Sequence, residues 1–135
     1  MRKGIRVGLV GLMAATVLGT APAAFASHDS GRSGGSGVEK RGTCSMGSQW
    51  KVKADFENSG LETEFEVDSN VVGQTWKVRL SDNGQVYFKG QRVTQAPSGS
   101  FEVRKLTANQ AGSDTIKGEA INLATGETCS GSVTI

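Results

Sequence analysis

Residues 50–68 read WKVKADFENSGLETEFEVD, and apolar and charged side chains alternate along them almost one by one. Every second residue from Val52 to Phe56 is apolar, and the alternation resumes at Leu61 after a polar stretch that contains Gly60. Successive side chains of a β-strand point to opposite faces, so a period of two indicates two strands, each with one buried face. A short polar loop with a glycine is typical of the connection between them. The segment therefore predicts an antiparallel β-hairpin.

The same period continues toward the C-terminus, and no stretch of useful length has a helical period. A second hairpin is predicted around Asn83-Gly84, with Val86 and Phe88 pointing inward and Tyr87 outward. A change of apolar phase beyond Gly90 predicts a β-bulge. Further strands are expected at 100–105, 115–122 and 128–135. Seven strands with regular turn signals predict an antiparallel β-sandwich of immunoglobulin-like or fibronectin type III-like size, with a closed barrel as the alternative.

The charges favour one assignment of strands to sheets. An outward row of four carboxylates runs along residues 62–68, namely Glu62, Glu64, Glu66 and Asp68. Opposite charges across a sheet are stabilising and like charges are not, so this strand needs basic neighbours. Lys51 and Lys53 on one side and Arg104 on the other supply them if the 50–56, 61–68 and 100–105 strands share a sheet. The remaining four strands then form the second sheet.

The N-terminus indicates export. Residues 1–26 have a basic start, an apolar run and the ending Ala24-Phe25-Ala26, which is typical of a cleaved signal peptide and too short for a membrane span. Residues 27–41 are rich in Gly and Ser and predict a flexible tail, followed by one domain at 42–135. The predicted mature protein is extracellular, with no membrane insertion after cleavage.

Two cysteines, Cys44 and Cys129, are present in the whole chain. Export places them in an oxidising compartment, where a disulfide is the expected state of such a pair. The bridge would join the segment before the 50–56 strand to the last strand. A catalytic thiol would need a histidine base, and a zinc site would need more than two soft ligands. The pair is therefore predicted to be structural.

Several chemistries are excluded or disfavoured. Without Arg2, Lys3 and Arg6 of the signal peptide, 12 basic residues face 13 acidic ones, a net charge of −1 that argues against a nucleic-acid partner. The single histidine, His28, lies in the predicted tail. Catalysis by histidine and metal binding by histidine are therefore excluded from the domain. No glycine-rich phosphate loop occurs. We expect no cofactor, no metal and no enzymatic activity. A carboxylate enzyme or a calcium site along Glu62–Asp68 is the weaker alternative to a solvated row.

The loops are the expected place of function, because a sandwich presents its loops at its ends. Three loops, at 69–74, 94–99 and 123–127, are predicted to cluster at one end. Their apolar residues are expected to cap the core, with a contact patch as the alternative. Trp50 and Trp76 follow the inward phase and are expected in the core, with a sugar-stacking platform as the alternative. The candidate binding residues are Val71, Val72, Gln74, Pro97, Ser98, Leu123, Thr125 and Glu127.

Several short stretches also carry a resemblance: GTCS at 42–45, QWKVK at 49–53, FEVDSNVVGQTW at 65–76, PSGSFEV at 97–103 and ATGETCSG at 124–131. From Arg41 to Ile135 the chain resembles a group of small secreted actinobacterial proteins of uncharacterised function. The resemblance implies export and supplies no catalytic residues.

The function expected from these observations is that of a secreted, non-catalytic binding module. Its partner would be an extracellular protein or a cell-surface component such as a cell-wall polymer. The alternatives are a carbohydrate or cell-wall-binding module with an exposed Trp76 or Tyr87, and an inhibitor of secreted hydrolases that presents the 94–99 or 123–127 loop.

Overall fold

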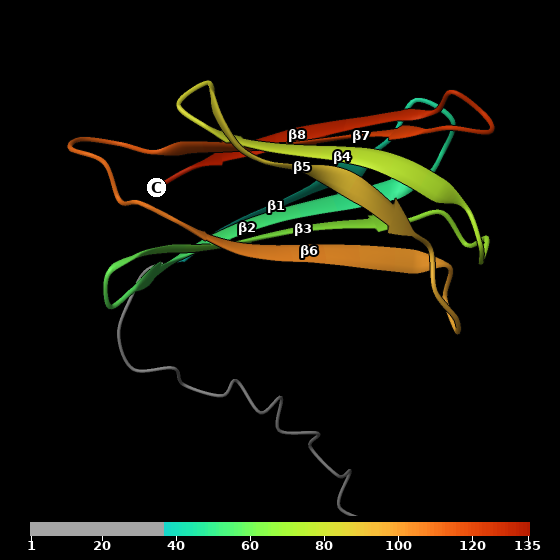
Figure 1. Cartoon of the computed structure of the whole chain (residues 1–135), viewed down its shortest axis with the longest axis horizontal. Helices are drawn as coiled ribbons and strands as arrows, with labels where there is room; N and C mark the ends of the chain where they lie inside the picture. The colour runs from blue at the N-terminus through green and yellow to red at the C-terminus, as the bar shows by residue number, and fades with distance from the viewer. Residues whose placement is uncertain (1–36) are drawn as a thin grey trace, which may run out of the picture. The chain divides into compact units, whose positions relative to one another are not determined.

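The computed structural model describes residues 37–135, which form two antiparallel four-stranded sheets (Figure 1). One sheet has the order β1-β2-β3-β6, with bounds Val38–Thr43, Gln49–Glu57, Gly60–Asp68 and Ser100–Thr107. The other has the order β5-β4-β7-β8, with bounds Gln85–Val93, Thr75–Asp82, Thr115–Asn122 and Thr128–Thr134. The predicted all-β, two-sheet architecture is confirmed. The predicted signal peptide (1–26) and residues 27–36 of the predicted tail, with His28, lie outside the described residues.

The expected number of strands, seven, was wrong, because the structure has eight. The additional strand is β1, which pairs with β2 from Val38 opposite Ala54 to Thr43 opposite Gln49. Residues 38–41 of this strand belong to the segment expected as a tail. Most β1 side chains are exposed, so the strand buries little apolar surface and is held by main-chain pairing. A period-two signal therefore could not reveal it.

The order of the other seven strands agrees with the sheet assignment that the charges favoured. β3 lies between β2 and β6, with Lys53 opposite Glu64 on one side and Arg104 opposite Glu64 on the other. Strands β4, β5, β7 and β8 form the second sheet, as expected.

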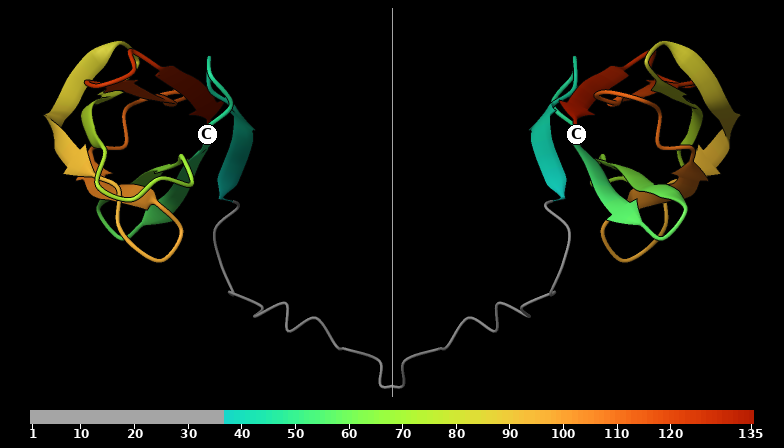
Figure 2. Two further views of the ribbon diagram at one scale, coloured as in Figure 1. Left: turned by 90° about the vertical axis from the view of Figure 1, so that its right-hand side faces the viewer. Right: turned by 90° about the vertical axis from the view of Figure 1, so that its left-hand side faces the viewer.

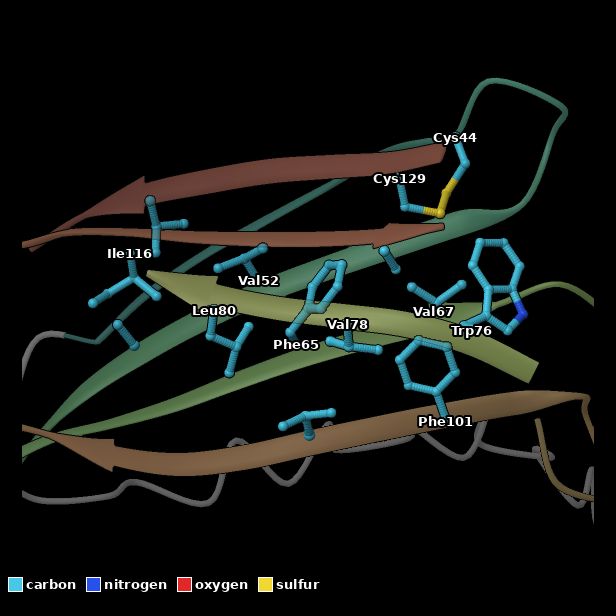
Figure 3. Close-up of a cluster of buried hydrophobic side chains, with 14 of the residues drawn as sticks. Cys44, Val52, Phe65, Val67, Trp76, Val78, Leu80, Phe101, Ile116 and Cys129 are labelled. Atoms are coloured by element: carbon cyan, nitrogen blue, oxygen red, sulfur yellow. A yellow bond between two sulfur atoms is a disulfide. The ribbon is translucent and has the colours of Figure 1, made fainter. Parts of the chain in front are cut away.

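The core lies between the two sheets and is built from the inward side chains that the alternation predicted (Figure 3). Trp76 is fully buried, and its ring centroid lies 6.2 Å from that of Phe101. Phe65 packs against Gly118 so closely that a Cβ there would come within 2.5 Å of its ring. A side chain at position 118 is thus excluded by the bulk of Phe65, which explains a glycine inside β7.

Strand β5 differs from its prediction. The register of β4 and β5 shifts between Leu80 and Ser81, which places a bulge at Tyr87 and not beyond Gly90. Val86, expected inward, is exposed, whereas Tyr87, expected outward, is half-buried against the core. The tight turn after Asp82 sets this register, because it pairs Ser81 with Val86 and leaves one extra residue on β5. Phe56 also departs from its inward phase, being 45% exposed at the end of β2.

The predicted disulfide is confirmed between Cys44, which follows β1, and Cys129 on β8, with Cα atoms 4.4 Å apart. The bridge joins one sheet to the other (Figure 3) beside the place where β1 and β2 contact β8. Trp50 is half-buried there, with its ring against Gly42 and Gly131. The described residues include no helix long and apolar enough to cross a membrane.

Candidate functional site

Four loops meet at one end of the sandwich, on the right in Figure 1 and facing the viewer on the left of Figure 2. Within each sheet, antiparallel pairing places the ends of the odd-numbered strands beside the starts of the even-numbered ones, and the 69–74 and 94–99 loops cross from one sheet to the other at this end. We call this end the loop tip; it comprises residues 44–48, 69–74, 94–99 and 123–127. Three of these loops are the ones predicted from the sequence. The fourth, 44–48, was missed because the strand before it was missed.

Hydrogen bonds between the loops hold the loop tip together. The amide of Ser69 donates to the carbonyl of Gly99 at 3.0 Å, and the amide of Gly73 donates to the carbonyl of Thr94 at 2.8 Å. Gly99 has a φ of +77°, and a Cβ there would come within 2.4 Å of the Val71 nitrogen. Only glycine fits this position, so the 69–74 and 94–99 loops pack main chain against main chain.

The 123–127 loop is anchored in the same way. Leu123 donates its amide to the carbonyl of Thr75 at 3.0 Å, which ties the loop to the start of β4. The side chain of Asn122 accepts the amides of Ala124 and Thr125 at 2.9 and 3.2 Å. Each loop of the tip is therefore positioned by bonds to the scaffold.

Apolar side chains are exposed on this scaffold. Val71, Val72 and Leu123 are 49%, 54% and 50% exposed, and Met46 of the fourth loop is 65% exposed. The core is closed without them, because the fully buried residues all come from strands or their immediate ends. Of the two readings of these residues, a cap on the core and a contact patch, the exposures favour the contact patch.

Not every candidate residue is available to a partner. Glu127 is buried, and its carboxylate accepts the amide of Met46 at 3.0 Å and both the amide and the hydroxyl of Ser48 at 2.9 and 2.6 Å. Burial alone would raise the pKa of Glu127, but these donors hold it below its ordinary value. Gln74 is half-buried and accepts the hydroxyl of Ser69 at 2.7 Å. These two residues shape the loops.

The other candidates are exposed. Pro97, which follows a cis peptide bond, and Ser98 lie at the outer turn of the 94–99 loop, and Thr125 lies in the 123–127 loop. The surface that the loop tip offers is therefore apolar at Val71, Val72 and Leu123, with small polar groups beside it.

The carboxylate row on β3 is cross-linked by cations. Lys51 Nζ lies 2.6 Å from a Glu64 oxygen and 3.2 Å from Glu66, and Arg104 lies 2.9 Å from the second Glu64 oxygen. Lys51 and Arg104 are thus confirmed as partners of the row, whereas Lys53 pairs with Asp55 at 3.0 Å. Glu64 is buried beneath its cations rather than solvated. Its oxygens lie within 4.8 Å of those of Glu66 and Glu102, and all three carboxylates are already paired with Lys51 or Arg104.

The pKa of Glu64 also argues against acid catalysis. Burial alone would raise it, but the hydrogen bond and charge of Lys51, with Arg104, hold it below its ordinary value. A general acid at neutral pH needs the opposite shift. The β3 row is therefore suited to joining strands.

A carboxyl group with a raised pKa lies at the other end of the sandwich. Asp82, which ends β4, is buried, and neither of its oxygens has a hydrogen-bond donor among the described residues. Burial and the adjacent charge of Asp114 raise the pKa of Asp82 to about 6. Asp82 and Asp114 are only 2% and 1% exposed, so a substrate in solution has no access to them.

The aromatic platform expected for a sugar-stacking site is absent from the described domain at the residues proposed for it. Trp76 is fully buried, and the hydroxyl of Tyr87 lies 2.7 Å from that of Thr63 in the interior. The carbohydrate alternative in its aromatic form thereby loses its support.

No family model, curated protein or solved structure matches the chain.

Proposed function

We propose that this protein is a secreted, non-catalytic binding module of immunoglobulin-like or fibronectin type III-like architecture. It contacts an extracellular protein or a cell-surface component through the loop tip. The observation that carries the proposal is the exposure of Val71, Val72 and Leu123 on loops that hydrogen bonds hold in place, the 69–74 loop on the 94–99 loop and the 123–127 loop on the start of β4. Apolar side chains held in place in this way lose little conformational freedom when a partner covers them.

The disulfide and the predicted signal peptide support the extracellular location. The non-catalytic character is supported by the absence of histidine from 42–135 and by the lowered pKa of Glu64. The exposed turn at Pro97 and Ser98 favours one further candidate, an inhibitor of secreted hydrolases that inserts this loop into an enzyme cleft.

The test is retention of partners from culture fluid and cell-wall fractions of the producing cell by the immobilised domain. The variant Val72→Asp/Leu123→Asp places two charges in the loop tip. The control Val86→Asp/Leu106→Asp introduces the same two charges near the opposite end of the sandwich. The residues that it replaces are 38% and 65% exposed. We expect the control to retain the partner and the loop-tip variant to lose it by about ten-fold or more.

Equal retention by both variants would contradict a site at the loop tip. Slowing of a secreted protease by the wild type and the control, but not by a variant shortened in the 94–99 loop, would select the inhibitor.

A further inference from the structure

A shallow hollow of about 680 Å³ lies on the outer face of the β5-β4-β7-β8 sheet, and no residue of the loop tip lines it. Its charged lining consists of Lys77 and Arg79 from β4, Lys89 from β5 and Glu119 from β7. All three cations are exposed. The hollow thus has a basic lining with one carboxylate.

The three cations are uncompensated. Arg79 lies directly opposite Lys89 in the β4–β5 register, a like-charge arrangement that costs stability. Neither of them, nor Lys77, forms an ion pair with a carboxylate of residues 37–135. Glu119 lies across from Arg79, but its carboxylate is bonded to Lys117 at 3.1 Å. An anion bound over Arg79 and Lys89 would remove the repulsion.

The opposite sheet shows how the same chain compensates charge elsewhere. On its outer face Lys51 and Arg104 are each bonded to two or more carboxylates. Charge is therefore segregated between the two faces, although the expected net charge of the mature chain is only −1. A whole-chain charge could not reveal this basic face.

Neutral hydrogen-bonding groups lie beside the cations. Gln91 is adjacent on β5, and the exposed hydroxyl residues Thr128 and Ser130 line the β8 side. Ile121 is the one exposed apolar residue in the lining, so the hollow lacks the apolar centre of a protein interface. A densely charged phosphate chain would meet Glu119. Carboxylates spaced by uncharged hydroxyl-bearing rings match this mixture better.

We propose that the outer face of the β5-β4-β7-β8 sheet binds an acidic polysaccharide. Carboxylates of the polymer pair with Lys77, Arg79 and Lys89. Hydroxyls of the sugar rings bond to Gln91, Thr128 and Ser130. Binding uses ion pairs and hydrogen bonds, with no aromatic stacking, and it does not depend on the loop tip.

The experiment measures binding of the disulfide-bonded domain to polygalacturonate, with dextran as the uncharged polysaccharide. The variant Lys77→Gln/Arg79→Gln/Lys89→Gln removes three charges from the hollow. The control Lys40→Gln/Arg41→Gln/Lys53→Gln removes the same charge from the other sheet. We expect the hollow variant to weaken binding by about ten-fold or more and the control by less than about two-fold. Dextran should not bind.

A second variant, Thr128→Val/Ser130→Ala, distinguishes binding of a sugar polymer from binding of an anion without sugar hydroxyls. We expect it to weaken binding to polygalacturonate and to leave binding to polyphosphate unchanged. Equal weakening by the two triple variants would overturn the site, because it would show a response to total charge alone. Failure of the wild type to bind polygalacturonate, or tighter binding to polyphosphate or duplex DNA, would overturn the ligand class. Val72→Asp/Leu123→Asp should leave binding unchanged, so failure here and failure at the loop tip are distinguishable.

Discussion

Single buried polar residues differ in how the fold satisfies them. Glu127 accepts three hydrogen bonds and stays charged, with a lowered pKa, whereas Asp82 lies beside Asp114 and has no donor to either oxygen within residues 37–135. A buried carboxylate without donors is costly, and protonation removes the cost. The two residues therefore respond to pH in opposite directions, since Glu127 stabilises the fold when charged and Asp82 when protonated.

Asp82 gives the first prediction. Its pKa is about 6 in the folded protein against an ordinary value of 3.8, so the folded state binds more protons between these values. Its stabilising protonation is fully present below pH 3.8 and is lost as the pH rises through about 6. We expect this group to lower the free energy of unfolding by about 2 kcal/mol between pH 4 and pH 7.

The measurement is urea unfolding across this pH range for the wild type, Asp82→Asn and the exposed control Glu57→Gln. Asp82→Asn should match the wild type near pH 4 and exceed its stability at pH 7, because an amide cannot ionise. The control should follow the wild-type profile. A wild-type decline that persists unchanged in Asp82→Asn would assign the titration to another group.

At the scale of the strands, the β3 row couples three strands of one sheet. Glu64 is bonded to Lys51 of β2 and Arg104 of β6, and its side chain is only 10% exposed. Glu62 also pairs with Arg104, at 3.3 Å, but both side chains are more exposed. Solvent screens an exposed pair, whereas a buried charge that loses its partner keeps its desolvation cost.

We therefore expect Glu64→Gln to lower the free energy of unfolding by about 1–3 kcal/mol and Glu62→Gln by less than about 0.5 kcal/mol. Both variants change the same row and alter a partner of Arg104, but Glu64 is more buried and has a second partner, Lys51. Chemical denaturation at neutral pH in low salt measures the difference. Equal effects of the two substitutions would contradict a larger contribution from the buried, doubly paired carboxylate.

The strands also show where prediction from sequence succeeds. The period of two along the chain and the basic neighbours of β3 led to the correct assignment of seven strands to two sheets, because burial imposes this period on those strands. β1 was not predicted from the sequence, because main-chain pairing and not side-chain burial holds this strand. The position of the bulge at Tyr87 was not predicted, because the register of β4 and β5 depends on a turn geometry that Asn83-Gly84 alone does not specify.

The candidate site was predictable in part for a similar reason. Loop positions follow from strand order, so the grouping of the 69–74, 94–99 and 123–127 loops could be predicted. The sequence could not show which loop residues turn inward. Glu127 is an example, because its hydrogen-bond donors come from residues 46 and 48, which are far away in sequence. The basic hollow requires knowing that Arg79 and Lys89 are opposite each other, which is a property of register.

At the scale of the whole molecule, the Cys44–Cys129 disulfide joins the two sheets and closes a loop of sequence separation 85. The edge strand β1 is attached next to it, and Trp50 packs between Gly42 and Gly131 on the same side. In the chain-entropy description, a cross-link of this length restricts the unfolded chain and contributes about 4.6 kcal/mol at most. For a domain of this size that is a large share of a net stability of about 5–15 kcal/mol.

We expect Cys44→Ala/Cys129→Ala to lower the free energy of unfolding by about 2–4 kcal/mol. The slope of this free energy against urea concentration should become steeper. The second effect follows because an unfolded chain without the cross-link exposes more surface than one held at residues 44 and 129. Tryptophan fluorescence reports the transition, since Trp76 is in the core and Trp50 is beside the bridge. Wild-type protein treated with a reductant is the matched control and should behave as the variant does. A loss below about 1 kcal/mol, with an unchanged slope of the unfolding free energy against urea concentration, would show that the core and the contacts of β1 and β2 with β8 hold the sheets together without the covalent link.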